Sequence, residues 1–230
     1  MSHTVFHALR PYCESPPDDL ISHFIGDHFP VDPDLAINIL RFPSAIEYTA
    51  GIHRSAILGP PLGLIALEDG NNSNPFCYIT KGPVRGSILH LCHDDDAVIA
   101  YSSLHDFLAV IDSAIVNRVW INDVKFDEAL DGLDRAGVVD YLMDLGDDDE
   151  AVAEICTLLP LVPTNELQLI EKLSRYVDFS VREATANAVI ASPHPALSAI
   201  AKRLASDAHP QVARQGQLAL SAVNRANSTT

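Results

Sequence analysis

Residues 63–111 of the chain are GLIALEDGNNSNPFCYITKGPVRGSILHLCHDDDAVIAYSSLHDFLAVI. This stretch contains four short apolar runs rich in β-branched and aromatic residues, at 63–67, 76–80, 87–92 and 97–101. Clusters of Gly, Asn, Asp and Pro separate the runs and supply turns. Because these connections are too short to hold a crossover helix, the sequence predicts four strands that pair in chain order as an antiparallel meander.

A helix is predicted to follow the last strand. Ser103 precedes Asp106 by three residues, which approximates a capping box with Asp in place of Glu or Gln. From Leu104 to Ile115 the apolar residues recur at helical spacing and define one apolar face. That face must be buried, and the meander is the nearest surface that can bury it.

The chain before the meander is predicted to start irregularly and then to form helices. A short helix is expected at 20–25, capped by one of the two aspartates that precede it. A second helix is expected to start at Asp32 and Pro33 and to end at Pro43, since proline is accepted in a first turn and breaks a helix interior. The first part of the chain is therefore predicted to be α+β.

Several motifs of this region occur in the order in which a known superfamily has them. A strand ends in an acidic Gly/Asn turn (LEDGNNSN), and a strand with aromatic and Cys residues follows (PFCYI). A Gly-Pro-Val turn, a strand that ends in His-Asp and a Ser-Leu-x-x-Phe-Leu helix come next. Over about residues 60–115 the chain resembles the SUKH superfamily, also called the Smi1/Knr4 family. The resemblance implies a protein-binding domain, either a bacterial immunity protein that neutralises a cognate toxin, often a nuclease, or a regulatory adaptor.

The composition changes near residue 150 to Ala, Leu, Val and Ile at helical spacing. The segments DFSVREATANAVIA (178–191) and DAHPQVARQGQLALS (207–221) both start with Asp, reach a Val close to an Arg and continue rich in Ala. Val181 and Val212 lie 31 positions apart, and Val152 precedes Val181 by 29. This period resembles HEAT-like repeats, in which helix pairs stack side by side.

These patterns predict four parts of the chain. They are a SUKH-like α+β domain at 1–118, an acidic connecting segment at 119–149, HEAT-like helices at 150–225 and a frayed tail at 226–230. The acidic run at 147–150 is expected to start a helix, because negative charge is favourable at a helix N-terminus.

The chain is strongly acidic, with a formal net charge of −16. Residues 1–118 hold 14 acidic and 6 basic residues, residues 119–150 hold 11 and 2, and the rest is close to neutral. This charge argues against nucleic acid and anionic membranes as partners and favours a basic protein, although acidity also serves solubility alone. The first thirty residues do not have the pattern of a secretory signal, and the four cysteines lack CxxC spacing, so a cytoplasmic protein with reduced thiols is expected.

One cluster has the residue types of a metal site. On a strand, His90 and Cys92 would point to the same side, as two metal ligands can, but the rest of the chain offers no further residues at ligand spacing. We therefore expect Cys92 to be a core thiol, and we expect neither a metal nor another cofactor.

No motif of nucleophilic, phosphate-binding or dinucleotide-binding chemistry occurs, and a non-enzymatic protein is predicted. Acids in the turns could form a glycosidase pair, but adjacent acids are common in turns. The predicted function is binding and neutralising a basic toxin domain; the alternative is an adaptor that binds through the HEAT-like helices. The predicted contacts are carboxylates in two turns: Glu68, Asp69, Asp94, Asp95 and Asp96.

Overall fold

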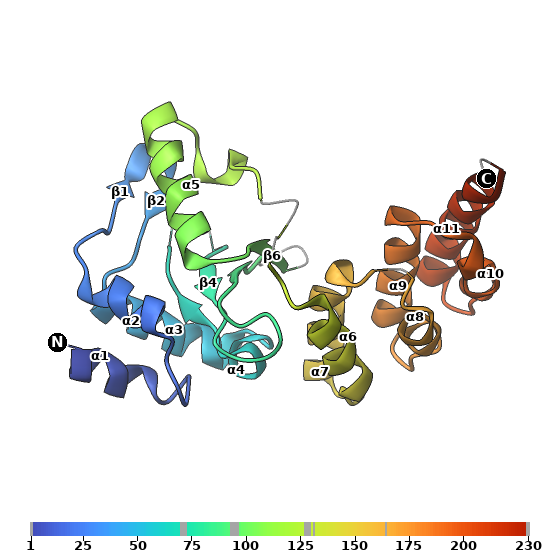
Figure 1. The fold of residues 1–230 in the computed structure, drawn as a ribbon, viewed down its shortest axis with the longest axis horizontal. Helices are drawn as coiled ribbons and strands as arrows, with labels where there is room; N and C mark the ends of the chain where they lie inside the picture. Colours follow the sequence, from blue (N-terminus) through green and yellow to red (C-terminus); the bar gives the residue numbers. More distant parts are fainter. Residues whose placement is uncertain are drawn as a thin grey trace. The chain divides into compact units, whose positions relative to one another are not determined.

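The structure, a computed structural model, describes residues 2–69, 73–92, 97–126, 130, 132–163 and 165–228. It divides into two compact units, Met1–Leu133 and Asp134–Thr230. The first unit combines helices with two antiparallel sheets, and the described part of the second is helical (Figure 1). The predicted α+β class is confirmed.

The larger sheet of unit 1 has the predicted strand order. Its four antiparallel strands follow one another as β3 (Ile65–Ala66), β4 (Phe76–Tyr78), β5 (Ile88–His90) and β6 (Val98–Tyr101). The predicted meander is therefore confirmed, with strands shorter than the apolar runs that form them.

Residues next to β3 receive a further pairing from the chain that follows β2 (Ile37–Asn38). The Leu40 amide donates to the Leu67 carbonyl at 2.8 Å, and the Asp69 amide donates to the Asn38 carbonyl at 3.1 Å. Ile39 and Glu68 form an antiparallel bridge. β2 also pairs with β1 (Val31–Asp32), so a segment early in the chain joins both sheets.

Both faces of the central strands are buried. Residues 64–68 are each 0% exposed, which explains why 64–67 are apolar at successive positions instead of alternating. The helices α3 (Phe42–Ser55) and α5 (Leu104–Asn117) contact β3 and β6, respectively. Phe107 and Ile111 on the predicted apolar face of α5 are buried.

The N-terminus of α5 has the predicted cap. The Asp106 amide donates to Ser103 Oγ at 3.1 Å, and Ser103 Oγ donates to the Asp106 carboxylate at 2.6 Å. This reciprocal pair satisfies a backbone donor that would otherwise lack a partner in the first turn. Asp106 thus contacts the Ser103 hydroxyl, whereas the Glu or Gln of a capping box accepts from the backbone N–H of the cap residue.

The helices before the meander differ from those predicted. α1 (Ser2–Leu9) forms where an irregular start was expected. α2 (Asp18–Ile25) contains the predicted helix, but Pro17 holds the cap position, so the predicted aspartate cap is wrong.

The helix predicted between Pro33 and Pro43 is wrong. Only a 3₁₀ turn, η1 (Pro33–Leu35), forms, and Ala36 ends it with a φ of 55° before β2 begins. Pro43 lies in the first turn of α3 instead of ending a helix, where its missing N–H costs no hydrogen bond. The short helix α4 (Gly59–Leu62) then leads into β3.

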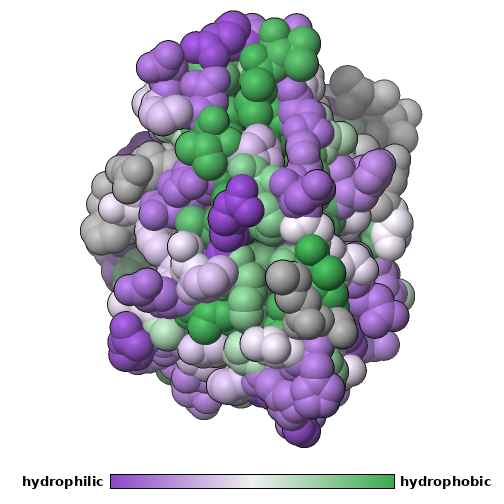
Figure 2. All heavy atoms as spheres, turned by 90° about the vertical axis from the view of Figure 1, so that its left-hand side faces the viewer, coloured by the Kyte–Doolittle hydropathy of each residue, from purple (hydrophilic) through white to green (hydrophobic). Residues whose placement is uncertain are grey.

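Unit 1 presents a mixed surface. Val31 of β1 is 60% exposed and Val116 of α5 is 80% exposed. Asp32 follows Val31 in the chain and pairs with Arg118, two residues after Val116, at 2.5 Å. Figure 2 faces the side that holds α1, α2 and β1 in Figure 1, and shows hydrophobic side chains interspersed among hydrophilic ones. Hydrophilic and exposed apolar side chains therefore lie together on this face.

Unit 2 is built from helices whose starts are marked by aspartates. The side chains of Asp134, Asp148 and Asp178 accept hydrogen bonds from the first turns of three helices, so the prediction that the acidic run starts a helix is confirmed. The described helices are α6 (Arg135–Asp144), α7 (Asp149–Leu158), α8 (Leu167–Leu173), α9 (Phe179–Ala191), α10 (Ser198–Ala205) and α11 (Pro210–Ser228), with 3₁₀ turns η3 (Leu159–Leu161) and η4 (Pro195–Leu197). α11 thus extends into the segment expected to fray.

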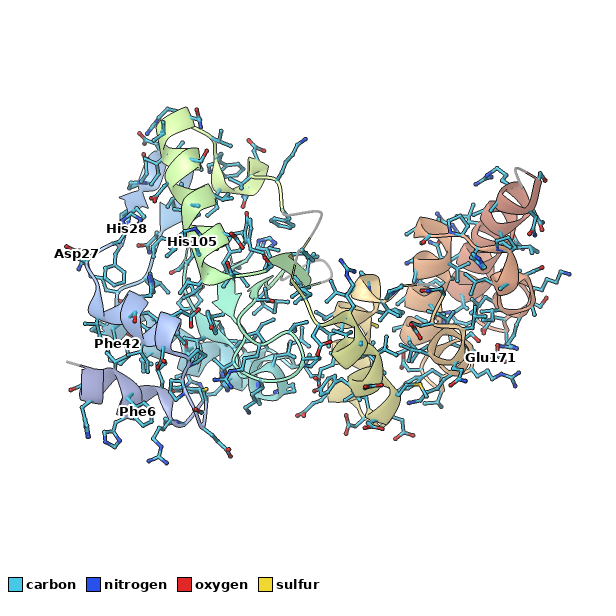
Figure 3. All side chains as sticks on the ribbon, in the orientation of Figure 1. Phe6, Asp27, His28, Phe42, His105 and Glu171 are labelled. Atoms are coloured by element: carbon cyan, nitrogen blue, oxygen red, sulfur yellow. The ribbon has the colours of Figure 1, made fainter. Side chains whose placement is uncertain are left out.

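The two Val-Arg segments found in the sequence give α9 and α11, and an ion pair connects them. Val181 and Val212 are both 0% exposed. Arg182 Nε lies 2.8 Å from the Asp207 carboxylate, and both side chains are mostly buried. A second network joins α8 to α10, where Glu171 pairs with Arg203 at 2.8 Å (Figure 3).

Gly216 of α11 permits a close approach of this helix to the end of α10. A Cβ at this position would lie 2.2 Å from the carbonyl carbon of Leu204, at the end of α10. Gly216→Ala is expected to force the two helices apart and to lower the free energy of unfolding by about 2 kcal/mol. Urea denaturation followed by circular dichroism measures the change.

Gly51→Ala is the matched control, because Gly51 also lies inside a helix and a Cβ there meets nothing within 4 Å. It is expected to stabilise the protein by about 0.5–1 kcal/mol, the gain of alanine over glycine in a helix. Equal effects of the two substitutions would contradict the close contact between α10 and α11.

Candidate functional site

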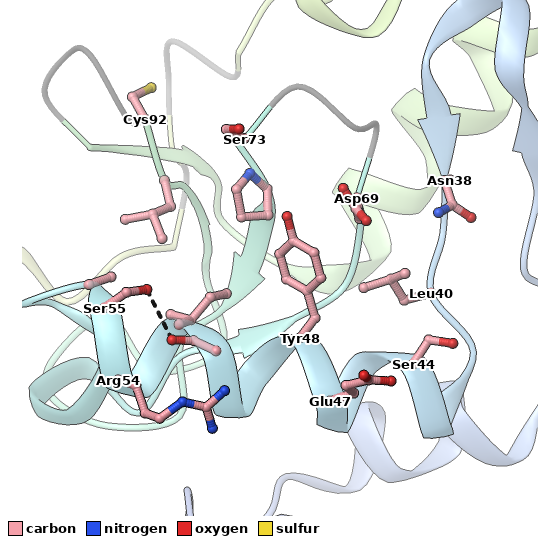
Figure 4. A pocket seen from close by; sticks show the side chains of 15 residues that line it. Asn38, Leu40, Ser44, Glu47, Tyr48, Arg54, Ser55, Asp69, Ser73 and Cys92 are labelled. Atoms are coloured by element: carbon pink, nitrogen blue, oxygen red, sulfur yellow. Dashed lines mark hydrogen bonds between the residues drawn. The ribbon is translucent and has the colours of Figure 1, made fainter.

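A pocket of about 980 Å³ lies in unit 1 beside α3, and we call it the α3 pocket (Figure 4). The opposite side of α3 faces the sheet, where the Ala66 amide donates to the Thr49 hydroxyl at 3.0 Å. Residues spaced three or four apart on the other side of the helix therefore face the pocket. Its lining is Asn38, Leu40, Ser44, Glu47, Tyr48, Gly51, Ile52, Arg54, Ser55, Ala56, Asp69, Ser73, Pro75, Leu91 and Cys92.

The lining of this pocket contains two carboxylates, Glu47 on α3 and Asp69 after β3, and we call this pair the acidic rim. Glu47 is exposed, and Asp69 is half-buried. Tyr48 belongs to α3, and Figure 4 shows that the side chains of Tyr48 and Asp69 point toward one another. Burial, the charge of Asp69 and a hydrogen bond to its carboxylate raise the pKa of Tyr48 to about 12. The phenol therefore keeps its proton and donates a hydrogen bond to Asp69.

The structure separates the two acids predicted in the first turn. Asp69 lines the α3 pocket, whereas Glu68 is 0% exposed. Neighbouring residues of an extended chain point to opposite sides, so Glu68 points into the core when Asp69 points outward. Glu68 therefore cannot offer its carboxylate to a partner, which corrects that prediction. Asp94, Asp95 and Asp96 lie outside the described residues.

The buried Glu68 carboxyl has an unfavourable environment for a charge. Burial and the neighbouring Asp69 raise its pKa to about 8, and the backbones of Asn38 and Phe76 oppose that shift only partly. Neither carboxyl oxygen has a hydrogen-bond partner of normal geometry among the described residues. A neutral, protonated carboxyl is thus the form that the folded protein prefers at neutral pH.

A second, smaller cavity of about 370 Å³ lies at the end of β5. Phe76 stacks on His90 with ring centroids 4.6 Å apart, and Phe126 approaches the same ring at 5.2 Å. We call this the aromatic cavity; its lining is Asn74, Phe76, His90, Cys92, Ile121, Asn122 and Phe126.

The cluster considered as a metal site lies at this cavity. His90 and Cys92 share one side, as predicted, with Cys92 Sγ 3.2 Å from His90 Nδ1. Within the described ranges, no group of three or more His, Cys, Asp or Glu residues gathers as metal ligands would. The two residues therefore form a thiol–imidazole pair there. Cys92 is half-buried, which corrects the expectation of a core thiol.

Sequence reasoning missed the α3 side of the pocket. Glu47, Tyr48 and Arg54 were not predicted as site residues, because the helix predicted in this region was expected to end at Pro43. Polar residues at 44, 47, 48, 54 and 55 recur at helical spacing, and this pattern indicates the outer face of a helix after Pro43.

Glu68→Gln tests the buried carboxyl. The folded pKa of Glu68, about 8, lies above the value of 4.5 for an exposed glutamate, so its contribution to stability is present below pH 4.5 and is lost as the pH rises through 8. The neutral glutamine does not titrate. The variant is expected to match the natural protein near pH 4.5 and to exceed its free energy of unfolding by about 4 kcal/mol at pH 9.

Urea denaturation at a series of pH values measures this difference. Glu47→Gln removes an exposed carboxyl from the same unit and is expected to leave the pH profile unchanged. Parallel stability profiles for the natural protein and Glu68→Gln would show that the carboxyl is not titrating in the core.

Within the part of the chain that the structure describes, no helix combines the length and the apolar character needed to cross a membrane. Compared with protein-family models, with curated proteins and with solved structures, the chain has no match. The resemblance to the SUKH superfamily and to HEAT-like repeats therefore stays a prediction from the sequence.

Proposed function

We propose that this chain is a non-enzymatic binding protein that holds a basic segment of a partner protein at the α3 pocket. The acidic rim of that pocket, on a chain with a net charge of −16, carries the proposal. The most specific form of the proposal is an immunity protein whose partner is a basic toxin domain, such as a nuclease, and the resemblance to the SUKH superfamily supports it.

The lining of the pocket suits a lysine or arginine side chain. Such a side chain has an apolar stem and a charged tip. Leu40, Ile52 and Pro75 provide apolar contacts for a stem, and the acidic rim provides carboxylates for the tip. A volume of about 980 Å³ is large enough to admit more than one side chain.

Charge and apolar contact would make different contributions to the complex. Exposed ion pairs contribute only about 0–1 kcal/mol each, so the acidic rim alone cannot give a tight complex. Long-range attraction raises the rate at which a basic partner meets an acidic surface, and salt weakens it. The apolar lining would then lengthen the lifetime of the complex.

A second candidate function is an adaptor that binds through the helices of unit 2. Exposed apolar side chains favour it: Val177 before α9 is 74% exposed and Leu218 of α11 is 50% exposed. Residues 151–230 hold 6 acidic and 7 basic residues, so binding through them would depend little on salt.

The test uses a lysine- and arginine-rich peptide as the basic segment and measures its binding by biolayer interferometry. The double variant Glu47→Gln/Asp69→Asn is expected to bind about tenfold more weakly at low salt, because two partly exposed ion pairs are lost. Most of that loss is expected in the association rate, and the natural protein is expected to lose a similar factor as salt rises.

The matched control is Glu14→Gln/Asp27→Asn, which removes two exposed carboxyls of unit 1 from positions outside the α3 pocket. It is expected to change the affinity less than twofold. Equal effects of both double variants on the affinity would contradict binding at the α3 pocket, because they would show that only the overall charge of the protein attracts the partner. Binding that resists salt and is lost in Val177→Ser/Leu218→Ser would favour the adaptor function instead.

A further inference from the structure

The thiol of Cys92 is hydrogen-bonded to an imidazole nitrogen. β5 ends at His90, and Cys92 follows two residues later, so the two side chains share one side of the chain. Sγ of Cys92 lies 3.2 Å from Nδ1 of His90 and 4.0 Å from the carbonyl oxygen of the same residue. The ring nitrogen is the closer acceptor for the thiol proton.

His90 is an uncharged imidazole that can accept this proton. In the tautomer that carries its hydrogen on Nε2, Nδ1 has a free electron pair directed at the thiol 3.2 Å away. A hydrogen bond with the Asn74 backbone raises the pKa of His90. Burial has the larger effect and lowers the pKa of His90, so the ring is a neutral base at pH 7.

The position of the ring is fixed by aromatic contacts on two sides. Phe76 stacks on it with an angle of 30° between the ring planes, and Phe126 meets it edge-on at 60°. A base held in place beside a thiol favours proton transfer, because little reorganisation is needed when the thiol reacts.

Cys92 can also be reached by a small molecule. It is half-buried and lines both the aromatic cavity and the α3 pocket. Cys13 and Cys77, in contrast, are buried at 3% and 0% exposure. Burial also raises the pKa of the Cys77 thiol, which holds it in its unreactive form.

We propose that Cys92, with His90 as its base, is a nucleophilic modification site for small α,β-unsaturated carbonyl compounds that enter the aromatic cavity. Phe76, Ile121 and Phe126 suit an apolar body, and Asn74 and Asn122 on the same lining suit a carbonyl group. A volume of about 370 Å³ is at the lower end of the range for small-molecule sites.

The addition needs no further reagent. The thiol proton moves to Nδ1 of His90, and the sulfur electron pair forms a bond to the β-carbon of the electrophile. The carbon–carbon π bond breaks, and the α-carbon takes a proton from the imidazolium, which returns His90 to its neutral form. The product is a thioether on Cys92, and every atom of the electrophile is kept.

The test treats the folded, full-length protein with N-ethylmaleimide or N-phenylmaleimide at pH 7 and follows each cysteine by peptide mass spectrometry. Cys156 is the internal control, since it is also half-exposed. Cys92 is expected to react at least about tenfold faster than Cys156, a modest part of the gain that a positioned base gives. The preference for the phenyl compound is expected to be larger at Cys92 than at Cys156.

His90→Gln retains a polar side chain and removes the base. It is expected to slow the modification of Cys92 by about tenfold and to leave Cys156 unchanged. In denaturing urea the four cysteines are expected to react alike, because only the fold distinguishes them. Circular dichroism verifies that the variant is folded.

Two results would overturn the proposal. One is a native protein in which Cys92 and Cys156 react within twofold of each other, a comparison that needs no variant. The other is a folded His90→Gln protein whose Cys92 reacts as fast as before.

Discussion

The complete burial of residues 64–68 is the constraint on which unit 1 depends. These residues receive β4 on one side and the chain after β2 on the other, so their backbone groups are paired in both directions. Their side chains are covered on both faces, which requires α3 to lie where it does. One cost accompanies this arrangement: the carboxyl of Glu68 is held in the core without hydrogen-bond partners of normal geometry among the described residues.

The same arrangement creates the surface features of unit 1. Since α3 contacts β3 with one side, its polar side faces outward beside Asp69, which follows β3. The α3 pocket is the space between that helix side and the ends of the strands (Figure 4). Cys92 lies at the boundary of this pocket and the aromatic cavity. A binding surface for a basic partner and a reactive thiol would thus be neighbours in this fold.

Unit 2 depends on short polar contacts at helix ends more than on strand pairing. Aspartate side chains start α6, α7 and α9, and Asp207 accepts from the His209 amide before α11. Asp207 also pairs with Arg182, so one carboxylate orders a helix start and connects two helices. An exposed pair would contribute little, but this pair is mostly buried and hydrogen-bonded, and removing one partner would leave a buried charge.

The sequence predicted most of the elements whose signals are local. The meander, the Ser103 cap of α5 and the helix start at the acidic run follow from turn residues, capping spacing and charge, all of which act between residues close in the chain. It failed between Pro33 and Pro43, where a helical apolar pattern was read instead of a strand. The left-handed Ala36 and the pairing of residues 38–40 with 67–69 replaced that helix, and this pairing joins segments far apart in sequence.

The candidate site shows the same division. Composition and local pattern were enough to establish that the chain is acidic, that Asp69 follows a buried strand, and that His90 and Cys92 share a side. Packing between distant segments, in contrast, buries Glu68, brings Glu47 and Tyr48 to the pocket that Asp69 lines, and places Phe76 and Phe126 against His90. The reason is that burial and side-chain neighbours are set by packing between distant segments, whereas composition and alternation along a strand are properties of the local chain.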